Sequence, residues 1–228
     1  MGIVVRAGVV ALQLLGELVA PTRCAACEEL VAPRLLFCAA CSPSVTRAGP
    51  QPPREHAVFD YGGAVATAIA RFKYAGRSDL AARFAAAMTA RTLPAGAEVD
   101  LVVPVPLHPR RLVERGFDQA ALLALPIARS WGLRCATRVL LRTRPTPPQA
   151  SLDRAARSAN VADAFRCASP EAVRGRRILL VDDVRTTGAT LASCADVLDR
   201  AGAVEVRSLV LASRDRPGFV QKTTVYED

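Results

Sequence analysis

The chain has 228 residues, which is enough for one α/β domain of ordinary size and a small additional module. Hydrophobic residues make up 51% of it, so a substantial core can form, but no apolar segment reaches the length of a membrane span, and no membrane partner is expected. The net charge of +9 is compatible with nucleic acid or polyphosphate ligands, whereas 5% aromatic residues leave few surfaces for stacking single-stranded nucleic acid.

An apolar stretch at residues 7–20 could be taken for part of a signal peptide. Gln13 and Glu17 interrupt it, and Arg23 stands where a cleavage or lipidation site needs a small residue. The pattern therefore favours an amphipathic helix that ends at Pro21, in a protein that is located in the cytoplasm.

Two C-x-x-C pairs follow, Cys24 with Cys27 and Cys38 with Cys41. Each pair can direct two thiolates to one metal ion, and two pairs complete a closed tetrahedral set, which predicts a structural zinc site. Disulfide bonds and a redox motif are the alternatives. The cytoplasmic location argues against disulfide bonds, and a redox motif would not need two pairs.

A segment rich in proline, from Gly49 to Pro53, predicts a linker. We therefore expect three parts: an N-terminal helix and zinc module at residues 1–48, a linker at 49–56, and a larger domain at 57–228.

Apolar strands alternate with helical patterns after this linker, which predicts a parallel α/β sheet flanked by helices. Ser78 is expected to cap the second helix, and Pro126 to kink or break the third. The strands are predicted at 58–61, 99–105, 139–141, 178–184 and 204–211, and the helices at 64–74, 79–91, 117–131, 153–165 and from about 187 onward.

The most informative stretch is 178–190, where an apolar strand is followed by Asp182 and Asp183 and then by a loop of small residues. The next helix begins with unpaired N–H groups that favour an anion, and Gly188 lets the backbone approach a ligand. Carboxylates at the end of a strand can accept hydrogen bonds from ribose hydroxyls or hold a hydrated Mg²⁺. The stretch predicts a site for a phosphate and a diol, as in ribose 5-phosphate; an ordinary strand–turn–helix is the alternative.

Further motifs occur in a fixed order along nearly the whole chain. They are Phe72–Gly76, Val103–His108, Arg115–Gln119, Arg142–Gln149, Arg157–Phe165 and the loop at 182–190. Together with the four cysteines, they resemble the ComF family (the ComFC-type competence proteins), small bacterial proteins with a zinc-binding segment and a phosphoribosyltransferase domain.

The resemblance implies a type I phosphoribosyltransferase fold that binds phosphoribosyl pyrophosphate (PRPP) with Mg²⁺. Asp182 and Asp183 would be the catalytic residues and would contact the ribose hydroxyls. The residues around the ribose and its 5-phosphate would be Asp182, Asp183, Val184, Arg185, Thr186, Thr187, Gly188, Ala189 and Thr190. The pyrophosphate loop would contain Pro106, Leu107, His108 and Arg110, and the candidate anion contacts are Lys73, Arg115, Arg142 and Arg144. The segment at 142–149 would be a mobile loop that closes over the substrate.

Two positions depart from the family pattern. Asp118 stands where the family usually has asparagine, and its charge would be unfavourable near a pyrophosphate loop unless Arg115 or Arg111 offsets it. Arg185 stands where an aliphatic or aromatic residue is more common, and it is expected either to point away from the phosphate loop or to add a phosphate contact.

The implied activity is transfer of phosphoribose from PRPP to an acceptor that the sequence does not identify. Thr186 replaces the aspartate that handles the base proton in 6-oxopurine salvage enzymes, which disfavours hypoxanthine and guanine. The alternative is a non-catalytic role: a PRPP sensor, or a protein that binds single-stranded DNA beside a helicase-like ATPase during DNA uptake in natural transformation. The sequence does not predict the oligomeric state.

Overall fold

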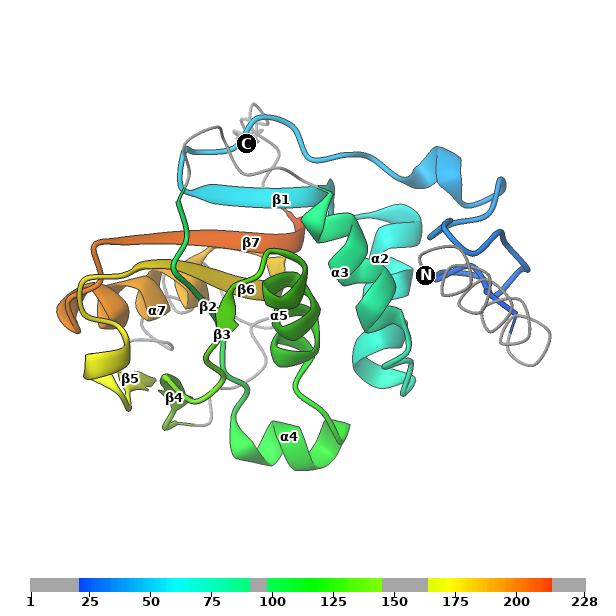
Figure 1. Cartoon of the computed structure of the whole chain (residues 1–228). Helices are drawn as coiled ribbons and strands as arrows, with labels where there is room; N and C mark the ends of the chain where they lie inside the picture. The colour runs from blue at the N-terminus through cyan, green and yellow to red at the C-terminus, as the bar shows by residue number, and fades with distance from the viewer. Residues whose placement is uncertain (1–20, 91–97, 145–163, 215–228) are drawn as a thin grey trace, which may run out of the picture.

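A parallel five-stranded sheet forms the centre of the computed structural model, which describes residues 21–90, 98–144 and 164–214 (Figure 1). The strand order is β1–β7–β6–β2–β3, and every neighbouring pair runs parallel. The strands are β1 (Glu55–Asp60), β2 (Leu101–Pro104), β3 (Arg134–Cys135), β6 (Arg177–Arg185) and β7 (Glu205–Ser213).

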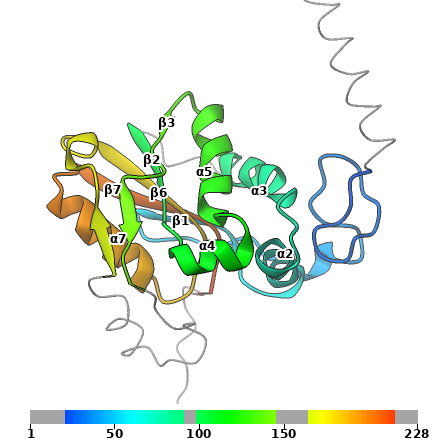
Figure 2. The ribbon, with the colours of Figure 1, turned by 90° about the horizontal axis from the view of Figure 1, so that it is seen from below.

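Helices cover both faces of this sheet, as Figure 2 shows. One face packs against α2 (Gly63–Tyr74), α3 (Leu80–Thr89) and α5 (Gln119–Ser130), and the other against α7 (Ala189–Arg200). Because both faces are covered, β6 is apolar at successive positions: Leu179 and Val181 pack on the first side, Ile178 and Leu180 on the second. The α/β architecture follows directly from this pattern.

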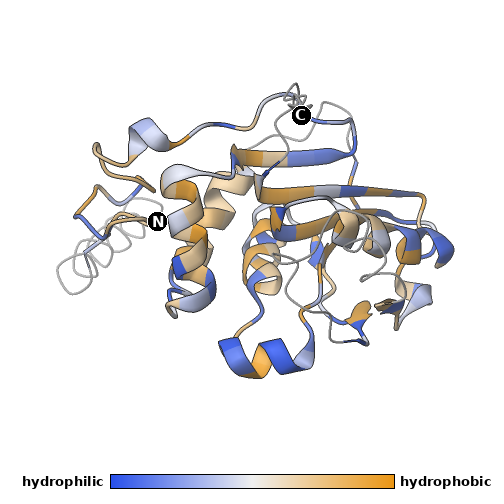
Figure 3. Ribbon diagram, turned by 180° about the vertical axis from the view of Figure 1, so that it is seen from behind, coloured by the Kyte–Doolittle hydropathy of each residue, from blue (hydrophilic) through white to orange (hydrophobic). Residues whose placement is uncertain are grey.

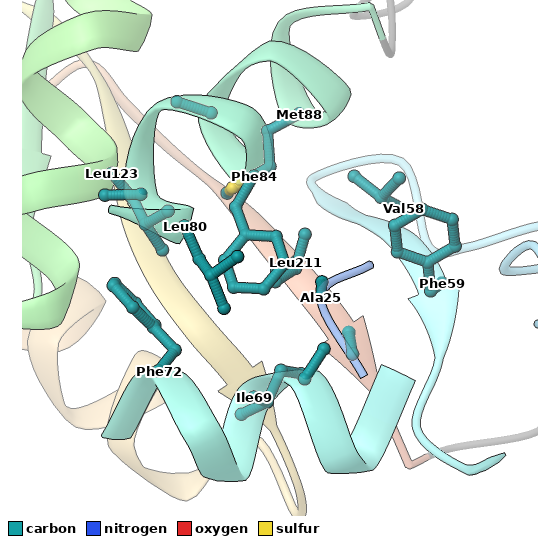
Figure 4. Packing of buried hydrophobic residues seen from close by; sticks show 14 of the residues in the cluster. Ala25, Val58, Phe59, Ile69, Phe72, Leu80, Phe84, Met88, Leu123 and Leu211 are labelled. Carbon is teal, nitrogen blue, oxygen red and sulfur yellow. The ribbon is translucent and has the colours of Figure 1, made fainter. Parts of the chain in front are cut away.

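The largest side chains of the first layer interlock between α2, α3 and α5 (Figure 4). The rings of Phe72 and Phe84 meet edge to face with their centroids 5.4 Å apart, and both are fully buried. This packing fixes α2, whose last turn carries Lys73 and Tyr74 towards the carboxyl ends of the strands.

Several short elements lie outside these layers. A second, antiparallel sheet pairs β4 (Leu140–Arg142) with β5 (Phe165–Cys167), and two 3₁₀ turns span Ser42–Ser44 and Pro170–Ala172. Helix α4 (Pro109–Arg115) has no buried residue. Figure 3 shows it away from the sheet, with hydrophilic ends and a hydrophobic middle.

The cysteine segment shares the core of the sheet domain. Ala25 and Phe37 are buried in the same cluster as Phe59 and Ile69. Residues 46–48 also pair antiparallel with the edge strand β1 through main-chain hydrogen bonds. The N-terminal module is therefore packed onto the domain rather than held at a distance by a linker.

Some local predictions differ from the structure. Glu55 and His56, expected in the linker, begin β1. Ser78 does not cap α3, since the position before the helix is Asp79 and no side-chain cap bond forms there. Pro126 lies inside α5 without ending it, because Leu123 and Ile127 bury this helix against the sheet.

Phe165 was expected at the end of a helix, but it lies in β5 opposite Arg142. The rest of the helix predicted at 153–165 lies outside the described residues, as do most of the loop at 142–149 and the helix at 7–20. Within the described ranges, no helix combines the length and the hydropathy that a membrane crossing requires.

Candidate functional site

A cavity of about 720 Å³ opens where β2 and β6 end. Ligands bind at the carboxyl ends of strands in open α/β sheets, because the loops that follow the strands converge there. The walls are the loop after β6, the loop after β2, the last turns of α2, and α4.

The loop after β6 has the form of a phosphate cradle. Gly188 precedes α7 with a φ of 77°, a conformation that glycine adopts without strain. The hydroxyl of Thr187 accepts a hydrogen bond from the N–H of Ala189 (3.4 Å), and Thr187 is not part of the cavity lining. Thr186 and Thr190 line the cavity beside Gly188.

The two acidic residues have different surroundings. Asp183 is buried, and the ammonium Nζ of Lys73 lies 2.7 Å from its Oδ2. Asp182 accepts a hydrogen bond at Oδ1 from the main-chain N–H of Asp183 (2.8 Å). Burial and the nearby charge of Asp183 raise the pKa of Asp182 to about 8, so Asp182 is harder to ionise than an ordinary aspartate. The pair therefore combines Asp183, whose charge is matched by a lysine, with Asp182, whose ionisation is disfavoured.

The loop after β2 is closed by a side-chain cap. Nδ1 of His108 accepts a hydrogen bond from the N–H of Arg110 (3.2 Å) at the start of α4. The imidazole therefore caps the start of α4, which is a structural role. Pro106, Leu107, His108 and Arg110 all line the cavity.

Asp118 is stabilised by main-chain donors. Its Oδ1 accepts from the N–H of Ala121 (3.0 Å), which caps α5, and its Oδ2 accepts from the N–H of Leu107 (3.4 Å). Burial raises the pKa of Asp118. Arg115, which was expected to offset its charge, instead donates to Gln119 Oε1 (2.7 Å) and lies over the ring of Tyr74.

Arg185 is buried and directed towards the sheet edge. Its guanidinium donates to Ser213 Oγ at 3.2 and 3.1 Å, and it also contacts Glu55 and Gln51. These contacts engage the guanidinium at the sheet edge, although Arg185 also lines the cavity beside Gly188. The side chain ties β6 to β7 and β1 at the base of the loop.

The four cysteines form a cluster in which all Sγ atoms lie within 4.8 Å of one another. Burial acts to raise the pKa of Cys24, but main-chain N–H groups from Cys27, Cys38 and Ala26 outweigh it and lower the pKa to about 6. The neighbouring thiols raise the pKa of Cys41 to about 12. Thiols this close cannot all ionise without a cation between them, so the cluster could hold a metal ion.

Arginines of α2 and of the loop that follows it attach this cluster to the domain. Arg71 donates to the carbonyl of Ala26 (2.9 Å) and pairs with Glu28, which Arg77 also contacts. Ser44 accepts from the N–H of Ala64 (3.0 Å) in the first turn of α2. The cysteine segment thus holds the helix that carries Lys73.

Comparison with known proteins agrees with this geometry. Residues 142–227 match the family model of the phosphoribosyl transferase domain. The DNA utilization protein YhgH of Salmonella typhi is 34% identical over 199 residues, which cover 81% of this chain and 87% of that protein. Competence protein F of Haemophilus influenzae is 34% identical over 114 residues, which cover 50% of each.

The chain belongs to the ComF family of the phosphoribosyltransferase superfamily. The family predicted from the motifs is confirmed, and so is the type I fold, a parallel sheet flanked by helices, with a cysteine cluster compatible with a zinc module. Among solved structures, glutamine PRPP amidotransferase from B. subtilis matches with a TM-score of 0.38 and 23% identity, over 59% of this chain and 26% of that one.

In this ComF-type protein, most of the predicted site residues lie around one cavity. Thr187 and Arg144 are not part of its lining. The residues brought together are Lys73, Pro106, Leu107, His108, Arg110, Arg115, Arg142, Asp182, Asp183, Val184, Arg185, Thr186, Gly188, Ala189 and Thr190.

Other lining residues were not among the predicted site residues, and those with an aromatic or arginine side chain are Tyr61, Tyr74, Arg111 and Arg214. Tyr61 and Arg214 directly follow β1 and β7, so the same rule about strand ends would have indicated them. Tyr74 follows Lys73, and its side chain is largely exposed at the edge of the cavity.

Proposed function

We propose that the cavity binds PRPP together with Mg²⁺ and that the protein transfers the phosphoribosyl group to an acceptor. The observation that carries the proposal is that a phosphate cradle, a pair of acidic residues and the loop after β2 all line one cavity. Each part matches one part of PRPP: the 5-phosphate, the ribose diol and the pyrophosphate.

The residues around the cavity would act by holding PRPP in position and by matching its charges. The N–H groups at the start of α7 and the hydroxyls of Thr186 and Thr190 would hold the 5-phosphate. Asp183 would accept a hydrogen bond from the ribose, and protonated Asp182 could donate one. Residues 106–108 and Arg110 would contact the pyrophosphate, with Arg142 as a further cation. Bound Mg²⁺ would neutralise charge on the leaving group.

The reaction would proceed through a sugar cation as pyrophosphate leaves and the acceptor attacks C1 of the ribose. A rigid site stabilises such a state by holding the ring and the leaving group in place. Thr186 cannot take a proton from a base at neutral pH, so the acceptor must lose its proton to another group or to water. This argument disfavours hypoxanthine and guanine as acceptors.

The names of the relatives suggest a second proposal, which is a role in DNA utilization or competence. We propose the cytoplasm as its location from the sequence pattern alone. In that role the cavity would sense PRPP, and the protein would act beside a helicase-like ATPase or on single-stranded DNA. Binding of single-stranded DNA would weaken steeply as salt is raised, since it depends on release of counterions. Undetectable or salt-insensitive binding would contradict the DNA role.

Titration calorimetry with PRPP and Mg²⁺ tests the first proposal. We expect saturable binding by the wild type, followed by release of pyrophosphate when the correct acceptor is added from a panel of bases. Failure of the wild type to bind PRPP would eliminate both the transferase and the sensor. Binding without pyrophosphate release for any acceptor would favour the sensor.

A further inference from the structure

Lys73 occupies the place of a cation beside the ribose-binding carboxylates, and we propose that it is the positioning residue for Asp183. As a consequence, a sugar phosphate would bind the acidic pair without a divalent cation, and only the pyrophosphate would need Mg²⁺. The inference rests on the proposed function, because it concerns the same cavity.

The contact itself is short and sheltered. Nζ of Lys73 lies 2.7 Å from Oδ2 of Asp183, and the two side chains are 20% and 7% exposed. Water screens such a pair poorly, so each charge depends on the other. Burial acts to lower the pKa of Lys73, but the charge and hydrogen bond of Asp183, together with the charge of Asp182, outweigh it and raise the pKa, so the lysine remains a cation.

The residue type fits this role. Lys73 and Lys222 are the two lysines of a chain whose other basic residues are arginines. An ammonium is a compact charge that can engage a single carboxylate oxygen, whereas a guanidinium tends to take both oxygens in a fork. Contact at Oδ2 lets Asp183 present its other oxygen to a ribose hydroxyl.

The other charged groups around the acidic pair do not replace Lys73. Asp118, at the start of α5, adds negative charge, and Arg115 of α4 is engaged with Gln119. Arg142 of β4 interacts through its charge with Asp182, not with Asp183. Among the described residues, the ion pair that the structure gives Asp183 is the one to Lys73.

Two roles for the acidic pair can be separated by their response to Mg²⁺. If the pair held a hydrated Mg²⁺, that ion would have to displace Lys73 from Asp183, and sugar phosphate binding would require Mg²⁺. If Lys73 remains in place, the ion is unnecessary there. Ribose 5-phosphate distinguishes the two, because it carries the diol and the 5-phosphate but no pyrophosphate.

The experiment measures the affinity for ribose 5-phosphate by calorimetry, with and without Mg²⁺, for the wild type, Lys73→Met, Lys73→Arg and Arg54→Met. We expect the wild type to bind equally well in both conditions. Lys73→Met should bind about 10–100-fold more weakly without Mg²⁺, the loss expected for a charge-assisted contact, and Mg²⁺ should restore part of it. Lys73→Arg should retain more affinity than Lys73→Met.

Arg54→Met is the control, since it removes the cation of an exposed ion pair with Glu205, just before β1 and outside the lining of the cavity. It should bind ribose 5-phosphate as the wild type does. If Lys73→Met and the wild type bind ribose 5-phosphate with equal affinity without Mg²⁺, the inference is overturned but the proposed function is not. The same holds if the wild type needs Mg²⁺ to bind ribose 5-phosphate. The comparison of wild-type affinity with and without Mg²⁺ still tests the inference if Lys73→Met fails to fold. A wild type that binds neither ribose 5-phosphate nor PRPP would overturn the proposed function, and the inference with it.

Discussion

Asp183→Asn is expected to destabilise the protein by about 3–5 kcal/mol and to weaken PRPP binding by at least about 10-fold. The substitution leaves the ammonium of Lys73 in a mostly buried place without its carboxylate. It also removes the charged acceptor that the ribose hydroxyl would use, and hydrogen bonds to charged groups contribute about 1.5–3 kcal/mol. Urea unfolding and calorimetry measure the two effects on the same preparation.

Asp182→Asn is the matched comparison and should behave differently. Because burial and Asp183 raise the pKa of Asp182 to about 8, its side chain takes up a proton more readily than an ordinary aspartate, and asparagine resembles the protonated form in shape and charge. The folded pKa lies above the unfolded value of about 4, so the wild type loses stability from this group as the pH rises between these values. The asparagine variant has no such loss and should gain stability relative to the wild type from pH 5 to pH 8. Equal destabilisation by the two substitutions at pH 7 would contradict this account of the pair.

Loss of metal from the cysteine cluster is expected to have the second large effect. Four thiols within 4.8 Å repel one another when they ionise, and the segment buries Ala25 and Phe37 in the core of the sheet domain. We expect Cys24→Ser to lose bound zinc and to lower stability by an amount of the order of 5 kcal/mol, below the full binding energy of a structural zinc ion. Metal analysis and thermal unfolding provide the measurement.

Cys135→Ser is the control for that substitution, because Cys135 lies in β3 and is not part of the cysteine cluster. It should retain the wild-type metal content and change stability by less than about 1 kcal/mol. Wild-type protein that contains no zinc and unfolds at the same temperature with or without a chelator would contradict the metal assignment.

The fold could be predicted because the sequence patterns that indicate it lie within short segments of the chain. Apolar strands such as 178–184 and the helical patterns between them specify a parallel sheet, and the order of the motifs specifies the family. The errors occur where packing outweighs local preference. Pro126 is tolerated because residues before and after it in α5, Leu123 and Ile127, are buried in the core. Phe165 joins a strand because it pairs with Arg142.

The site residues that are neighbours in the sequence could be predicted, but the contacts between residues far apart in the sequence could not. Residues 182–190 carry the acidic pair and the phosphate loop in one continuous segment. The contact between Lys73 and Asp183 joins residues far apart in the sequence, and only the docking of α2 brings them together. Likewise, the sequence gives no sign that Asp118 is stabilised by main-chain N–H groups rather than by an arginine, since those donors depend on where α5 begins.

A crystal structure of the wild type with PRPP and Mg²⁺ tests the central claim most directly. We predict the 5-phosphate on the main-chain N–H groups at residues 187–190, the ribose hydroxyls on Asp182 and Asp183, and Lys73 still in contact with Asp183. PRPP bound elsewhere on the protein, or an empty cavity at saturating PRPP, would contradict the claim.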